Sequence, residues 1–391
     1  MKTLKIVLRL ILNLFLFILY FLSGFVPRNS KIVVYGCPRN GFSDNAKYAF
    51  LYNSLSPKKQ SEHYWVSSNR QLINEIQGRG LNAVYRWSWR GSWITLRAGV
   101  HIYSSYASDI NFWLSRNAHL INYWHGIPLK KIEFDIKRGP LAKRYNPKNV
   151  SEKIASIIYY IYHPAIFKRP HALCNPLPKF NQIFMRAFRV SERELFQDLY
   201  PRWRYIKGDN TVEELLNNKL DNLSALGQDR KLILYLPTFR DSDGTWVKKH
   251  LLDHLSDLEI ILGENRFILL VKLHPNEAIK PLKSYKNIHF VESSVDIYPL
   301  LKHATVVLTD YSSVMIDTAV CGKEVVLYWP DFAEYTADSR DSYFNLRAIF
   351  GDKPLRTAAE LKSFLSGSIV DRVVNKEISE EFIGINSHDA Q

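Results

Sequence analysis

Two histidines follow apolar segments, one in each half of the sequence. His125 follows the run "HLINYW" and is itself followed by "GIP", and His274 ends the run "RFILLVKLH". Imidazole titrates near neutral pH, so it suits a general base or acid. A single histidine of this kind is more often structural, with its nitrogens bonded to nearby backbone. Two of them, both at the carboxyl end of a predicted strand, favour a shared catalytic site.

An arginine follows the strand-like segment "KLILYLP" in the second half. A guanidinium at this position, Arg240, can hold two phosphate oxygens at once, which a lysine cannot do. The alternative is an exposed arginine in a loop between a strand and a helix. The residue alone does not decide between the two.

The segment "TVVLTDYSSVMIDTAVCGK" ends a predicted strand at Thr309 and Asp310 and opens a helix with Ser312 and Ser313. Serine at such a position can simply cap the helix. Hydroxyls and unpaired backbone N–H groups at a helix start also bind phosphate. With Arg240 in the same half, we expect a diphosphate pocket, in which Asp310 orients a serine or a histidine.

Other polar patterns give weaker evidence for a binding site. Lys130 and Lys131 follow the first histidine and either steer an anionic acceptor or are simply solvated. Asp241 and Asp243 form a superficial metal-binding pair without a third ligand. We expect neither a metal nor a cofactor, and the sequence contains no P-loop and no G-x-S-x-G motif.

Short apolar strands alternate with helix-length segments in both halves, which predicts parallel sheets. The fold class is therefore α/β, with two doubly wound, Rossmann-like domains that face a cleft. We place the N-terminal α/β domain, on the acceptor side, at residues 30–205 and the C-terminal, donor-binding domain at 206–391. The strand segments are "KIVVYG", "HYWVSS", "NAVYR", "VHIYSS" and "HLINYWHG", then "KLILYLPTFRD", "RFILLVKLHP", "NIHFVE", "TVVLTDYSS" and "EVVLYWPD".

The first 29 residues form a separate apolar segment. Residues 6–26 are apolar around the whole circumference of a helix and are flanked by basic residues on both sides. No small-x-small cleavage site follows, which favours retention as a membrane anchor. The segment either spans the bilayer or lies in its interface, with both ends in the cytosol.

Net charge and cysteine content limit the partners and the compartment that we expect for the protein. The net charge of +14 indicates an anionic partner. Charge alone does not distinguish anionic lipid, nucleic acid and a phosphate-rich substrate. No nucleic-acid-binding motif accompanies it, so we expect no nucleic acid partner. The three cysteines, Cys37, Cys174 and Cys321, show no C-x-x-C spacing, which suits a reducing compartment.

Six segments, in this order along the chain, resemble the CDP-glycerol glycerophosphotransferases of bacterial wall teichoic acid and related polymer synthesis. They run from about residue 30 to beyond residue 345, and three positions differ from the usual family pattern, Ile127 and the pair Trp203-Arg204. The segments are "GFSDNAKYAF", "YWHGIPLKKIEFD", "YPRWRYI", "YLPTFRD", "KLHP" and "LTDYSSVMIDTAVCGKEVVLYWPDFAEY".

The resemblance implies a GT-B-like pair of domains, association with the cytoplasmic membrane surface and transfer of glycerol phosphate from CDP-glycerol. It also implies that His125 is catalytic, that His274 is the second functional histidine, and that the loop arginine and the serines bind phosphate. The expected substrate-binding residues are Arg240, Asp310, Ser312, Ser313, Gly126 and Lys130.

The expected reaction is attack by an acceptor hydroxyl on the β-phosphorus of a CDP-alditol, with release of CMP. His125 takes the proton of a hydroxyl on a lipid-linked saccharide acceptor. The alternatives are a CDP-ribitol ribitolphosphotransferase, a GT-B glycosyltransferase that uses a nucleotide sugar, and a membrane-anchored binding protein without catalysis. The sequence leaves open whether one unit or many are added.

Overall fold

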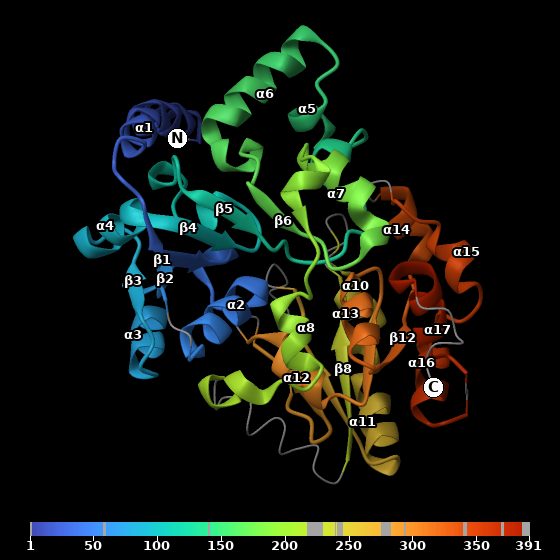
Figure 1. Ribbon diagram of the computed structural model, residues 1–391. Helices are drawn as coiled ribbons and strands as arrows, with labels where there is room; N and C mark the ends of the chain where they lie inside the picture. Colours follow the sequence, from blue (N-terminus) through green and yellow to red (C-terminus); the bar gives the residue numbers. More distant parts are fainter. Residues whose placement is uncertain are drawn as a thin grey trace. The chain divides into compact units, whose positions relative to one another are not determined.

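A computed structural model gives the architecture of the protein (Figure 1). The chain folds into two compact units, each with its own sheet. Unit 1 comprises Met1–His125, Ile132–Tyr205 and Asp209–Leu215, and unit 2 comprises Gly126–Lys131, Ile206–Gly208 and Leu216–Gln391. The structure describes residues 2–57, 60–139, 141–216, 230–238, 240, 245–274, 283–292, 295–338, 342–368 and 371–384.

The sheet of unit 1 is parallel throughout, in the order β3-β2-β1-β4-β5-β6-β7. The order reverses between β1 and β4, and ligands of such sheets bind at the carboxyl ends of the strands at this reversal. The strands are β1 (Asn29–Gly36), β2 (Glu62–Ser67), β3 (Ala83–Tyr85), β4 (Ala98–Tyr103), β5 (His119–Asn122), β6 (Ala172–Cys174) and β7 (Leu195–Phe196).

The strands of unit 1 form because their apolar side chains are covered on both faces, as in other parallel sheets. Val34 and Tyr35 of β1 and Trp65 of β2 are completely buried. The helices that flank them are α2 (Asp44–Leu55), α3 (Arg70–Gly78), α4 (Trp89–Arg97), α5 (Ala142–Tyr145), α6 (Val150–Tyr162), α7 (Asn181–Phe188) and α8 (Pro201–Ile206).

The N-terminal helix α1 (Lys2–Ser23) packs beside α6 in unit 1 (Figure 1). Among the residues that the structure describes, no helix is both long and apolar enough to cross a bilayer. The outward face of α1 is nevertheless strongly apolar, and its exposed apolar side chains are Leu8, Ile11, Leu12, Leu14, Phe15, Ile18, Leu19, Phe21 and Leu22.

Arg28 fastens the end of α1 to the rest of unit 1. Its guanidinium donates to the carbonyl oxygens of Thr95 (3.2 Å) and Leu96 (2.5 Å), near the end of α4, and to that of Leu114 (2.9 Å). These are carbonyls that a helix end leaves without an intrahelical partner. Burial lowers the pKa of Arg28 to about 10, so the side chain stays charged at neutral pH.

The sheet of unit 2 is also parallel, in the order β10-β9-β8-β11-β12. Its order reverses between β8 and β11. The strands are β8 (Lys231–Leu236), β9 (Phe267–Val271), β10 (Ile288–Phe290), β11 (Val306–Thr309) and β12 (Glu324–Leu327). The prediction of an α/β fold with parallel sheets in both halves is thus confirmed.

The core of unit 2 lies between this sheet and its helices. Trp246, Leu255 and Leu262 pack with Tyr235 and Val271 of the sheet. The helices are α10 (Trp246–His250), α11 (Leu255–Glu264), α12 (Ile297–His303), α13 (Val314–Val320), α14 (Phe332–Asp338), α15 (Leu346–Phe350), α16 (Ala358–Leu365) and α17 (Asn375–Ile378).

Replacing Arg28 with methionine should loosen α1 and destabilise unit 1. Several buried carbonyls then lose a charged donor, so we expect the free energy of unfolding to fall by at least about 2 kcal/mol. Urea unfolding measures this change. The matched control is Arg97→Met, because Arg97 is an exposed donor to one carbonyl, that of Pro27. Equal small losses in both variants would contradict the role assigned to Arg28.

Candidate active site

The strand that leads to His125 ends earlier than the sequence suggested. β5 stops at Asn122, because Trp124 has a left-handed backbone (φ 50°), which a tryptophan rarely adopts. Two buried asparagines hold this conformation. The Asn122 side chain accepts from the Trp124 N–H (2.7 Å), and the Asn45 amide donates to the Trp124 carbonyl (2.7 Å). A strained residue kept in place by its surroundings is typical of a functional site.

His125 itself is exposed, and its orientation is fixed on one side. Its Nδ1 lies 3.2 Å from the Ser105 hydroxyl oxygen, just beyond the end of β4. Asn122 donates to the Ser105 carbonyl (3.0 Å), so one asparagine positions both the serine and the backbone before the histidine. When Nδ1 carries the proton, Nε2 is the basic nitrogen of the ring.

A buried carboxylate supports the Ser105 loop. Asp109 accepts from the backbone N–H groups of Ser105 (2.9 Å) and Tyr106 (3.3 Å). Burial raises the pKa of Asp109 to about 7, although these two N–H donors act in the opposite direction. The loop lies directly over the end of β1, where a Cβ on Gly36 would come within 2.5 Å of the Asp109 carbonyl oxygen.

Sequence reasoning did not find Ser105, Asn122 or Asn45. Ser105 ended a predicted strand, and Asn122 was counted within an apolar run. A polar residue in a strand buried on both faces needs a partner, and this was the signal available for Asn122. Asn45 belongs to the segment "GFSDNAKYAF", which the resemblance had marked without assigning a role.

In unit 2, Arg240 is buried rather than exposed in its loop. Its guanidinium pairs with Asp331 (Nε–Oδ2 2.6 Å) and with Asp310 (Nη2–Oδ2 2.9 Å), and it also donates to the Thr238 carbonyl (2.5 Å). Burial acts to lower the pKa of Arg240, but the two carboxylates raise it above its ordinary value. Arg240 thus joins the ends of three neighbouring strands, β8, β11 and β12.

Asp310 is completely buried, and its carboxylate belongs to the hydrogen-bond network around Arg240. It accepts from the backbone N–H of Thr238 (3.0 and 2.9 Å) and from that of Tyr311 (2.6 Å), in addition to the Arg240 pair. Its side chain therefore orients a threonine and an arginine, not the serine or histidine that we expected. No part of its carboxylate is left at the surface for a substrate.

The two serines lie where the sequence placed them, between β11 and α13. Ser312 accepts from the Val314 N–H (3.3 Å), which is a helix-capping contact, and the Ser313 side chain makes no capping hydrogen bond. Both are half-buried. His274, also half-buried, lies three residues beyond β9, at the same edge of the sheet. Asp241 and Asp243 lie outside the described residues.

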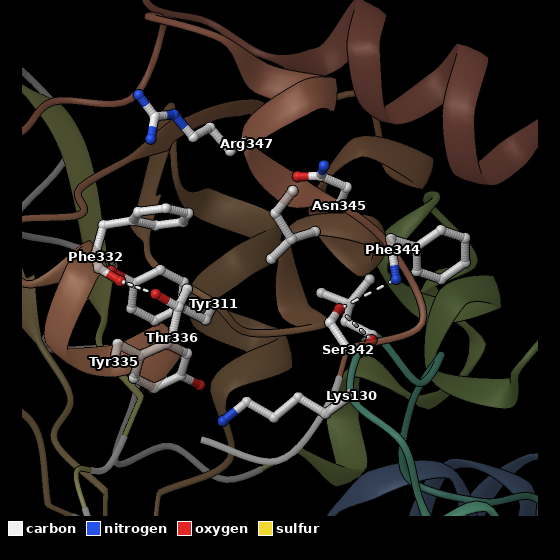
Figure 2. A pocket seen from close by; sticks show the side chains of 11 residues that line it. Lys130, Tyr311, Phe332, Tyr335, Thr336, Ser342, Phe344, Asn345 and Arg347 are labelled. Carbon is white, nitrogen blue, oxygen red and sulfur yellow. Dashed lines mark hydrogen bonds between the residues drawn. The ribbon is translucent and has the colours of Figure 1, made fainter. Parts of the chain in front are cut away.

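Lys130 lines a cavity of about 120 Å³ in unit 2, shown in Figure 2. Its amine lies 4.1 Å from the centre of the Tyr335 ring, and its backbone forms an isolated bridge with Ser342. Tyr311 and Asn345 line the same cavity. Gly126, the other predicted contact in this segment, is buried. The described residues contain no group of three His, Cys, Asp or Glu side chains able to hold a metal ion.

A family model that describes CDP-glycerol:poly(glycerophosphate) glycerophosphotransferases matches residues 18–376 of the chain. The chain belongs to this family. The match covers both units, and it confirms the family that the sequence resembled, together with the prediction of a glycerophosphotransferase of teichoic acid synthesis.

Individual relatives agree with the family. The chain is 26% identical to a teichoic acid poly(glycerol phosphate) polymerase of Bacillus spizizenii, over 88% of this chain and 85% of the relative. It is 24% identical to the polymerase of the same name in Bacillus subtilis, over 84% of this chain but only 42% of that longer protein. A solved structure of the wall teichoic acid polymerase TagF superposes with a TM-score of 0.74 at 21% identity, covering 100% of this chain and 94% of that one.

Replacing Ser105 with alanine should lower kcat about tenfold, because His125 loses the hydrogen bond that orients its ring. KM for the donor should stay unchanged, because Ser105 contacts His125, whereas the predicted donor-binding serines, Ser312 and Ser313, lie in unit 2. Ser105→Thr restores the hydroxyl and should recover most of kcat. Steady-state CMP release measures both. A change in donor KM with kcat intact would contradict a positioning role.

Stability should depend on pH through Asp109. As pH rises from 4, the Asp109 carboxyl ionises in the unfolded chain but stays protonated in the folded protein. The free energy of unfolding therefore falls until about pH 7, where the buried carboxyl also ionises. Asp109→Asn removes this loss while keeping an acceptor for the two N–H groups. Relative to the unsubstituted protein, we expect the variant to gain about 2 kcal/mol between pH 5 and pH 8. Urea unfolding at both pH values tests this, and a pH-independent difference would refute it.

Proposed function

We propose that the protein transfers a glycerol phosphate unit from CDP-glycerol to a hydroxyl of a lipid-linked acceptor and releases CMP. The observation that carries the proposal is His125, an exposed imidazole held in one orientation at the edge of a parallel sheet. A histidine near neutral pH is the usual group for taking a proton from a hydroxyl nucleophile. Membership in the family supports CDP-glycerol as the donor.

In the proposed reaction, His125 takes the proton from the acceptor hydroxyl as its oxygen attacks the β-phosphorus. The bond from that phosphorus to the bridging oxygen breaks, CMP leaves with the electron pair, and a phosphodiester forms. Phosphoryl transfer depends mainly on positioning and on stabilising charge on the phosphate oxygens. The reaction so written needs no cofactor.

The donor is assigned to unit 2. Ser312, Ser313 and His274 lie at the carboxyl edge of its sheet, where α/β sheets bind their ligands. The predicted contact of Arg240 with the diphosphate remains a prediction, because its guanidinium is shared by Asp310, Asp331 and Thr238. We propose that Arg240 acts chiefly by fixing the loops that carry the serines. The GT-B-like assembly with a cleft also stays a prediction.

We further propose that α1 lies in the interface of the cytoplasmic membrane. Leu12 and Phe15, on its outward face, are 55% and 66% exposed, and a bilayer surface would cover them and their apolar neighbours. A donor of this class is made in the cytosol, which favours the cytoplasmic face. The net charge of +14 suits anionic lipid.

His125→Ala should lower kcat at least a hundredfold, because the variant lacks the proposed base. The affinity for CDP-glycerol should stay unchanged, because the proposed donor-binding residues remain. CMP release and calorimetric titration with CDP-glycerol measure the two quantities. Lys143→Gln, at an exposed basic residue of unit 1, is the control. Unchanged turnover in His125→Ala would refute the base.

The same assay separates the rival functions. CMP release from CDP-glycerol, but not from CDP-ribitol or nucleotide sugars, is expected with a lipid-linked acceptor. Preference for CDP-ribitol would make the enzyme a ribitolphosphotransferase, and turnover of a nucleotide sugar would make it a glycosyltransferase. Sizing the products then distinguishes the addition of one unit from that of many.

A further inference from the structure

A second cavity, of about 320 Å³, lies in unit 1 between α1 and the residues that follow α6. We call it the α1–α6 pocket. Its size is that of a small-molecule site. Its lining combines an arginine, Arg9, and a histidine, His163, with a mostly apolar wall that includes Phe112, Trp113 and Ile166. The reaction proposed above makes no use of this pocket.

The pocket is positively charged. No carboxylate lines it, and Arg9 forms no ion pair within the described part of the chain; its guanidinium instead lies 4.4 Å from the centre of the Tyr162 ring. Burial lowers the pKa of His163, and the charges of Arg9 and Arg144 lower it further. An anion in the pocket would offset this positive field, so the lining suits a negatively charged group.

The C-terminal end of α6, beside the pocket, does not need Arg9 as a hydrogen-bond donor. The last carbonyls of α6, those of Ile161 and Tyr162, already accept from the Asn13 side chain (2.9 and 3.1 Å). Arg9 is therefore not needed to satisfy them, although a cation near a helix C-terminus is favourable in itself.

The surroundings of the pocket are apolar. α6 buries none of its residues and exposes Val150, Ile154 and Ile157, while the adjoining α1 exposes its own apolar face. Phe17 of α1 and Tyr160 of α6 stack at 6.1 Å, so the two apolar faces adjoin one another. These faces suit a ligand that has a hydrocarbon chain as well as a negative charge.

One residue of the pocket lining packs against the segment that carries the proposed base. Tyr106 lines the pocket, and its ring packs against that of Trp124 at 6.0 Å. Trp124 immediately precedes His125, and Tyr106 immediately follows Ser105, which contacts the His125 ring. The pocket thus connects the apolar helices with the loop that positions the histidine, all within unit 1.

We propose that the α1–α6 pocket binds the phosphate group and the first part of the hydrocarbon chain of the lipid that anchors the acceptor. Arg9 and His163 contact the phosphate, and Trp113 and Ile166 contact the chain. The assignment to the acceptor rests on the proposed function; the binding of a lipid phosphate does not. The pocket would hold the acceptor lipid at the membrane surface while its hydroxyl reaches His125.

Calorimetric titration of the full chain with octyl phosphate, below its micelle concentration, tests the proposal. Octyl glucoside and inorganic phosphate provide the chain and the anion separately, and dihexanoylphosphatidylglycerol represents an ordinary membrane phospholipid. We expect octyl phosphate to bind at least tenfold more tightly than each of these three. Arg9→Gln and His163→Asn should each weaken it at least fivefold. Lys153→Gln, at an exposed lysine of α6 outside the pocket, should leave it unchanged.

Three results would overturn the proposal. Equal affinity in all variants would show that octyl phosphate binds elsewhere, and equal binding of inorganic phosphate would exclude a lipid site. Tighter binding of dihexanoylphosphatidylglycerol would assign the pocket to bulk phospholipid instead of the acceptor. Thermal melting of each variant confirms that it is folded. CMP release by the unsubstituted protein, measured separately, shows whether the proposed function itself fails.

Discussion

The site in unit 2 depends on one buried cation held between two buried carboxylates. Arg240 pairs with Asp310 and Asp331, and each of the three residues comes from the end of a different strand. Removing one partner from such a group leaves an uncompensated buried charge, which costs roughly 3–5 kcal/mol. The ion pairs therefore tie the three strand ends together, and Ser312 and Ser313 follow Asp310 closely in the chain.

In unit 1, neutral side chains hold the backbone before His125, although the completely buried Arg202 also pairs with Asp44 (2.5 Å) in this unit. Asn122 and Asn45 hold Trp124 in a left-handed conformation, and this turns the chain immediately before His125. Neutral amides are suited to this task because each supplies a donor and an acceptor on one short side chain. The histidine remains exposed, with its Nδ1 3.2 Å from the Ser105 hydroxyl oxygen.

Both sheets reverse their strand order near the candidate residues. The reversal lies between β1 and β4 in unit 1 and between β8 and β11 in unit 2. At such a reversal the connecting helices diverge to opposite faces of the sheet, which leaves room for polar loops. Ser105 follows β4, and Thr238 and Asp310 follow β8 and β11. The positions of the candidate residues are thus a consequence of topology as well as of local sequence.

The sequence by itself determined ten of the strands that the structure describes, the α/β class and the family, because apolar runs and short motifs are local properties. It did not predict the two short strands β6 and β7. It also placed His125, His274 and the two serines after strands. It could not determine that Arg240 is neutralised by Asp331, a residue 91 positions away, or that Ser105 meets His125. Those contacts depend on which strands become neighbours, and only the folded sheets decide that.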